Sequence, residues 1–165
     1  MTENKQVLSP GDVFPTLTLD RPGGGSFVIP GDFGDRYGVV LFYRGSWCPY
    51  CNAQLRAFQR ALEPLNDIGI GVAALSVDDE ATTAELIDKH RLTYPVGHSA
   101  DAGQLAAATG AFVDPDGGFL QSTGFVLDPA GRVIVSVYSS GAIGRLVPDD
   151  VLGLVRYHRE HVASD

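Results

Sequence analysis

The sequence lacks the features that mark several large classes of protein. Only two of its 165 residues are cysteine, two are lysine and one is methionine. Its longest apolar run, Val39–Tyr43, is far shorter than the roughly 20 residues of a membrane-spanning helix. The first ten residues, Met1–Pro10, are polar and lack the charged start and apolar segment of a secretory signal. We therefore expect a soluble, cytoplasmic protein with no membrane partner.

Basic residues are too few and too scattered to form a nucleic-acid surface. Twelve lysines and arginines stand against 20 acidic residues, and the net charge is −8. Because phosphate binding needs concentrated lysine and arginine, we expect no nucleic-acid partner. The charge favours solubility and leaves a monomer and a weak homodimer equally open.

The length and apolar content predict a single folded domain over residues 1–165. Hydrophobic residues make up 44% of the chain. A domain of this size buries about 70% of the surface of its unfolded chain. The sequence therefore supports a hydrophobic core without disulfides.

The order of predicted elements describes a mixed α/β sheet. Alternating residues on both sides of a glycine run predict an N-terminal hairpin, Thr16–Leu19 with Ser26–Ile29. Continuous apolar runs predict buried strands, and apolar residues three or four apart predict helices. The other expected elements are strand Gly38–Tyr43, a helix from Asn52 that kinks or ends near Glu63 because of Pro64, strand Ile70–Val77, helices Ala81–His90 and Gln104–Thr109, strands Thr123–Leu127 and Arg132–Tyr138, and helix Asp150–His161. This is the order of a thioredoxin-like fold, with helices on both faces of the sheet.

The two cysteines stand where a strand ends and a helix begins. Cys48 and Cys51 follow the strand Gly38–Tyr43 and are separated by two residues. Free N–H groups and the dipole of a helix start favour a thiolate, and they can lower a thiol pKa from about 8.5 to between roughly 3.5 and 7.5. Residues three apart on a helix face each other, so the two sulfurs can form a disulfide. The spacing predicts a redox-active pair, near which Arg44 adds positive charge.

Two other readings of the cysteine pair are weaker. A zinc site needs a second pair of ligands at a suitable spacing, and none of the four histidines provides one. Two inert buried cysteines are the other alternative, since free cysteine is often a small core residue. We therefore expect no metal and no cofactor.

Several segments resemble the peroxiredoxin superfamily. They are Gly11–Pro15, Val39–Tyr43, Leu75–Asp78, Tyr94–Val96 and Phe125–Val133. Together they resemble the alkyl hydroperoxide reductase and thiol-specific antioxidant group, especially its small peroxiredoxin Q-like and peroxiredoxin-like members. The resemblance covers nearly the whole chain.

The active-site motif departs from the pattern of that superfamily. Laid over the family motif, Arg44 falls at the proline, Cys48 at the threonine and Cys51 at the peroxidatic cysteine. Trp47–Cys51 also resembles the thioredoxin site, in which the first cysteine is the nucleophile. The family's second active-site arginine has no match, because Gln121–Gly124 stands at its place.

The resemblance implies an antioxidant thiol peroxidase. In this hypothesis the Cys51 thiolate attacks the peroxide, Cys48 closes the disulfide, and a thioredoxin- or glutaredoxin-like protein reduces it. Arg44 holds the thiolate and polarises the peroxide, while Ser46 donates a hydrogen bond. One alternative is a protein disulfide reductase or redox relay with Cys48 as nucleophile. The other is a non-catalytic interaction domain that has kept the fold.

Overall fold

The computed structural model describes residues 6–161 and contains a five-stranded mixed sheet. The expected absence of a secretory signal rests on Met1–Pro10, and the first five of these residues lie outside the described range. The strands run in the order β5-β4-β3-β6-β7, and β3 pairs in parallel with β4 and antiparallel with β6. Their bounds are β3 Tyr37–Phe42, β4 Ile70–Leu75, β5 Val96–Gly97, β6 Thr123–Leu127 and β7 Val133–Tyr138. The predicted α/β sheet is confirmed.

Successive residues of β3 face opposite sides of the sheet and join two separate cores. Tyr37, Val39 and Leu41 pack in a cluster with side chains of helices α1 (Pro49–Arg60), α2 (Leu62–Asp67) and α5 (Pro148–His161). Val40 and Phe42 pack in a second cluster on the other face. That face is covered by the N-terminal hairpin, the short helix η1 (Gly31–Phe33) and helix α4 (Ala102–Thr109). The continuous apolar run of β3 is therefore explained by burial on both faces.

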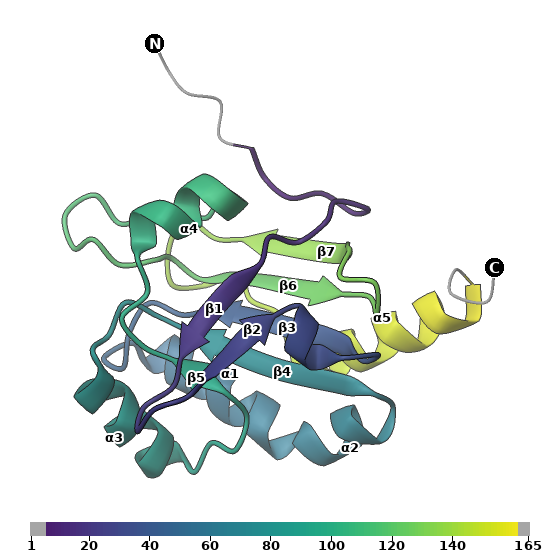
Figure 1. Ribbon diagram of the computed structural model, residues 1–165, viewed down its shortest axis with the longest axis horizontal. Coiled ribbons are helices and arrows are strands. Elements are labelled where there is room, and N and C mark those ends of the chain that lie inside the picture. Colours follow the sequence, from purple (N-terminus) through teal and green to yellow (C-terminus); the bar gives the residue numbers. More distant parts are fainter. Residues whose placement is uncertain (1–5, 162–165) are drawn as a thin grey trace.

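The predicted N-terminal hairpin is confirmed. Strand β1 (Leu17–Asp20) pairs antiparallel with β2 (Ser26–Ile29), and the hairpin crosses the near side of the sheet in Figure 1. Leu19 packs so closely on Gly97 of β5 that a Cβ at that glycine would lie 2.6 Å from the leucine Cδ2. An isolated bridge between Asp20 and His98 extends this contact.

The first long helix ends earlier than predicted. Helix α1 stops at Arg60, and α2 restarts at Leu62, so the break lies at Ala61 rather than near Glu63. Pro64 has no N–H for the carbonyl of Arg60, and its ring would clash with that carbonyl. The chain therefore breaks before this clash arises, and Pro64 falls in the first turn of α2, where proline is tolerated.

The remaining elements differ from the prediction mainly at their ends. Helix α3 (Glu80–His90) begins after Asp79, whose side chain accepts a hydrogen bond from the Thr82 N–H at 2.8 Å. Strand β4 ends two residues before the predicted Val77, and the two-residue strand β5 was not predicted. Among residues 6–161, no helix combines the length and the apolar character needed to cross a bilayer.

Two glycines with opposite surroundings test the packing of this fold. A Cβ at Gly38 of β3 would lie 2.4 Å from the Phe33 ring, whereas a Cβ at Gly153 of α5 would meet nothing within 4 Å. We expect Gly38→Ala to lower the free energy of unfolding by about 1–3 kcal/mol through overpacking. Gly153→Ala, the matched control, should raise it by about 0.5–1 kcal/mol because alanine favours a helix. Urea denaturation measures both, and a Gly38→Ala protein as stable as wild type would contradict this account.

Candidate active site

The cysteine pair lies at the start of α1, directly after the loop that follows β3. Cys48 is the N-cap residue, with an extended backbone (φ −90°, ψ 113°), and Pro49 is the first residue of the helix. Proline suits this position because its missing N–H would have no helical partner there. Both cysteines are reduced and fully buried, with 0% of each residue exposed. The expected strand–turn–helix setting therefore places both sulfurs just below the surface.

Backbone N–H groups donate to both sulfurs. The Cys51 N–H donates to Cys48 Sγ at 3.3 Å, which is the capping bond of α1. The Arg44 N–H donates to Cys51 Sγ at 3.3 Å. These donors are fixed by the fold, so they favour negative charge on sulfur without having to be ordered first.

The Arg44 side chain lies beside the cysteines. Its Nη1 donates to Cys48 Sγ at 3.7 Å, and its Nε donates to the side-chain oxygen of Gln121 at 2.9 Å. The guanidinium carbon lies 4.9 Å from the centre of the Trp47 ring and 5.1 Å from that of Phe119. Arg44 is therefore held by a neighbouring side chain, Trp47, and by two that are distant in sequence, Phe119 and Gln121.

A second arginine, which the sequence analysis did not identify, also contacts both sulfurs. Arg145 Nη2 donates to Cys51 Sγ at 3.1 Å and to Cys48 Sγ at 3.7 Å. Its Nη1 donates to the Gln54 side-chain oxygen at 2.7 Å, and Gln54 in turn donates to the Leu146 carbonyl at 3.0 Å. The site thus has a second guanidinium, although it comes from the loop between β7 and α5 and not from the position occupied by Gln121.

Ser46 fixes the loop before α1 through its backbone. Its N–H donates to the Asp78 carboxylate at 2.8 Å, and its carbonyl accepts from the Asn52 side chain at 3.0 Å. Burial raises the pKa of Asp78, and the Ser46 N–H acts in the opposite direction. Both bonds involve the Ser46 backbone and not its hydroxyl, so the predicted hydrogen bond from Ser46 to the reacting atoms stays a prediction.

The two thiols differ in their tendency to ionise. Burial opposes ionisation of Cys48, but hydrogen bonds from the Cys51 thiol and N–H, Arg44 and the charge of Arg145 outweigh it and lower its pKa. At Cys51, burial and donation of its thiol proton to Cys48 raise the pKa, although Arg44 and Arg145 act against them. The balance of these contacts favours ionisation of Cys48 over that of Cys51. The alignment with the family motif, in contrast, implies that Cys51 is the attacking thiol.

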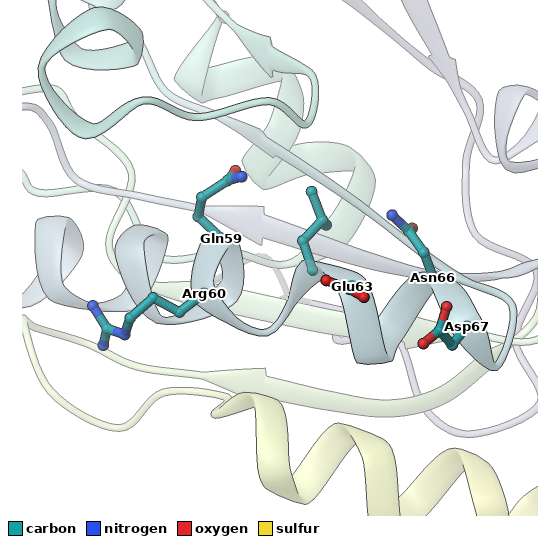
Figure 2. Close-up of a pocket in the computed structure, with 6 residues that line it drawn as sticks. Gln59, Arg60, Glu63, Asn66 and Asp67 are labelled. Atoms are coloured by element: carbon teal, nitrogen blue, oxygen red, sulfur yellow. The ribbon is translucent and has the colours of Figure 1, made fainter.

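A hollow on the surface away from the cysteines shows no comparable convergence of side chains. A depression of about 530 Å³ runs along α1 and α2, lined by Gln59, Arg60, Leu62, Glu63, Asn66 and Asp67. Figure 2 shows that its polar side chains point in different directions rather than toward one centre. Within residues 6–161, no group of three or more His, Cys, Asp or Glu side chains is placed to hold a metal ion.

The thioredoxin-like sheet and the cysteine pair at a helix start define a thiol oxidoreductase. Residues 10–136 match the model of the AhpC/TSA family, and the chain belongs to this family. A peroxiredoxin from Chlorobaculum tepidum is 28% identical over 152 residues, covering 88% of this chain and 70% of that protein. One from Thermotoga petrophila is 25% identical and covers 88% and 69%. The resemblance seen in the sequence is confirmed.

Solved structures confirm the fold. Peroxidoxin BcpB from Mycobacterium tuberculosis superposes with a TM-score of 0.78 at 20% identity, covering 91% of this chain and 97% of that one. A peroxiredoxin-like protein from Aquifex aeolicus also gives a TM-score of 0.78, at 16% identity, covering 92% of this chain and 88% of that one.

A shorter sequence similarity joins 62 residues of the chain, at 32% identity, to the thiol-disulfide oxidoreductase ResA of Oceanobacillus iheyensis, covering 37% of this chain and 32% of that protein.

The ionisation order can be tested by alkylation of the reduced protein. Iodoacetamide reacts with thiolates, so in mildly acidic buffer it should modify Cys48 well before Cys51. The rate should rise with pH through the lowered pKa of Cys48. Peptide mass spectrometry at partial modification measures the ratio, with Cys48→Ser and Cys51→Ser as references. Preferential modification of Cys51 would contradict the order derived from the hydrogen bonds.

Arg145 should matter to both sulfurs. Arg145→Gln removes a charged donor, so the pKa of Cys48 and that of Cys51 should both rise. A hydrogen bond to a charged group contributes about 1.5–3 kcal/mol, which corresponds to a loss of about ten-fold or more in alkylation rate at low pH. Arg156→Gln, on the exposed side of α5, is the control and should leave the rate unchanged. Equal rates for the two variants would exclude Arg145 from the site.

Proposed function

We propose that the protein is a thiol-dependent peroxidase, an oxidoreductase that uses peroxide as its acceptor, built as one thioredoxin-like domain. The convergence of two guanidinium groups on a cysteine pair at a helix start carries the proposal. Such a site favours a thiolate and offers fixed donors to the oxygen atoms of a peroxide. Membership of the AhpC/TSA family and the relatives named peroxiredoxin support the same activity.

In the first step the Cys48 thiolate attacks one oxygen of the peroxide. A sulfur–oxygen bond forms, the oxygen–oxygen bond breaks, and two electrons pass from sulfur to the peroxide. Water or an alcohol leaves after it takes up a proton, and Cys48 becomes a sulfenic acid. We assign the attack to Cys48 because its sulfur accepts from the Cys51 N–H at the helix start and from both arginines, and these donors favour its thiolate.

In the second step Cys51 resolves the sulfenic acid. Its sulfur attacks Cys48 Sγ, a disulfide forms, and water leaves. The two sulfurs are neighbours on the first turn of α1, since the Cys51 N–H already donates to Cys48 Sγ. A thioredoxin- or glutaredoxin-like dithiol protein then reduces the disulfide by exchange.

The two arginines and the loop divide the remaining work. Arg44 and Arg145 stabilise the thiolate and donate to the peroxide oxygens as charge moves onto them. Ser46 is proposed to contribute by holding the loop through Asp78 and Asn52. Trp47 and Tyr50, each 54% exposed on either side of Cys48, offer an apolar contact to the reducing protein. A reactive pair of this kind suits the reducing cytoplasm.

A second candidate function is reduction of protein disulfides, again with Cys48 as nucleophile. The Trp47–Cys51 segment and the short similarity to ResA favour it. It shares the low-pKa Cys48 with the peroxidase, so the two functions differ in substrate rather than in site.

Stopped-flow fluorescence of Trp47 separates these possibilities. We expect hydrogen peroxide to change the emission of the reduced wild-type protein rapidly, because Trp47 adjoins Cys48. The change should persist in Cys51→Ser and disappear in Cys48→Ser. The reverse pattern would restore the family order, with Cys51 as the attacking thiol. No response to peroxide, together with a rapid response to a protein disulfide, would establish the reductase instead.

A further inference from the structure

Arg44 is held in place by an arginine clamp, which we define as Trp47, Phe119 and Gln121. The Trp47 and Phe119 rings lie 4.9 Å apart at 69°, and the guanidinium lies within 5.1 Å of both ring centres. The Trp47 ring also folds back over Gly45, where a Cβ would come within 2.2 Å of the indole nitrogen. The rings thus cover the guanidinium and limit its hydration, which strengthens its interaction with a charge on Cys48.

Gln121 supplies the hydrogen bond that orients this guanidinium. It is 6% exposed and accepts from Arg44 Nε at 2.9 Å, which turns Nη1 toward Cys48 Sγ. Its own position is fixed twice, by its N–H donating to the Phe112 carbonyl at 2.8 Å and by its side-chain nitrogen, which lies 3.5 Å from an Asp114 carboxylate oxygen. Gln121 therefore joins Arg44 to a part of the chain that is 77 residues away.

The chemistry of an amide suits this task better than that of a carboxylate. A glutamate at the same place would form an ion pair with Arg44 and compete with the thiolate for its charge. An amide oxygen accepts the Nε–H and leaves the net positive charge available to sulfur. Orientation is thus obtained without neutralisation.

We propose that Gln121 is a positioning residue of the reaction, which fixes the Arg44 guanidinium so that it stabilises the Cys48 thiolate. The proposal rests on the proposed function for its catalytic meaning. Its first readout is the pH midpoint of Cys48 alkylation, which requires no peroxide. If loss of Gln121 raises this midpoint but the wild-type protein does not reduce peroxide, the inference stands and the proposed function is wrong.

Gln121→Leu is the primary variant, because it keeps an apolar volume and removes the acceptor. We expect a higher midpoint for Cys48 alkylation and a rate with hydrogen peroxide that is up to about ten-fold lower in mildly acidic buffer, the loss that one hydrogen bond can account for. The rate deficit should shrink at pH values above the new midpoint. Ser122→Ala is the matched control, since Ser122 is the next residue and is 2% exposed. An unchanged midpoint in folded Gln121→Leu would overturn the proposal.

A double-mutant cycle with Arg44→Gln tests whether Gln121 acts through Arg44. Each single variant should raise the midpoint, and the double variant should match Arg44→Gln alone, because a removed arginine cannot be misplaced. A purely structural effect of Gln121→Leu would add to that of Arg44→Gln, and additive shifts would overturn the proposal. Should Gln121→Leu fail to fold, Gln121→Glu takes its place in the cycle. Its carboxylate would pair with Arg44 and compete with the thiolate, so it should raise the midpoint only while Arg44 is present, and a shift that adds to that of Arg44→Gln would overturn the proposal.

Discussion

The site depends on a helix whose N-cap is a sulfur atom. A neutral thiol is a weak acceptor, so the capping bond from the Cys51 N–H gains most when Cys48 is ionised. The lowered pKa of Cys48 means that this contribution to stability is present above the pKa of the unfolded thiol and is lost as pH falls through the folded value. The raised pKa of Cys51 has the opposite sign, and it keeps a proton on the second thiol. The same hydrogen bond therefore caps α1 and favours the Cys48 thiolate.

A buried charge of this kind has to be balanced by fixed partners, and two arginines supply them. Arg44 comes from the loop before α1 and Arg145 from the loop before α5, and each is held by the amide oxygen of a glutamine. Gln121 and Gln54 are both neutral, so they orient the guanidinium groups without taking their charge. Within residues 6–161, neither guanidinium group forms an ion pair with a carboxylate. Their positive charge is therefore available to the sulfurs. This arrangement explains how the buried Cys48 thiol can still ionise.

Local patterns in the sequence predicted most of the fold, and long-range contacts account for what they missed. The apolar run of β3 and the apolar spacing of α1 are local signals, and the structure agrees with them closely. Pro64 predicts that the helix breaks, but its ring clashes with a carbonyl one turn upstream, so the break lies at Ala61. The candidate residues named from the sequence, Arg44, Ser46, Cys48 and Cys51, all lie in one continuous segment. Arg145 lies 94 residues from Cys51 in a loop of small residues, and no local pattern marks it.

The same interactions serve both halves of a catalytic cycle. Donors that stabilise the Cys48 thiolate make it available to a peroxide, and they also stabilise the reduced pair relative to its disulfide. A disulfide whose reduced form is stabilised in this way is easier for a partner dithiol to reduce, and Cys48 is a good leaving group because its thiolate is stable. The burial of both sulfurs beside the exposed Trp47 and Tyr50 adds a further distinction, because a small peroxide needs far less opening of the site than a protein partner does. In the proposed cycle the arginines favour both the oxidation of Cys48 and the reduction of the disulfide, and the burial of the sulfurs distinguishes the two steps by the size of the reactant.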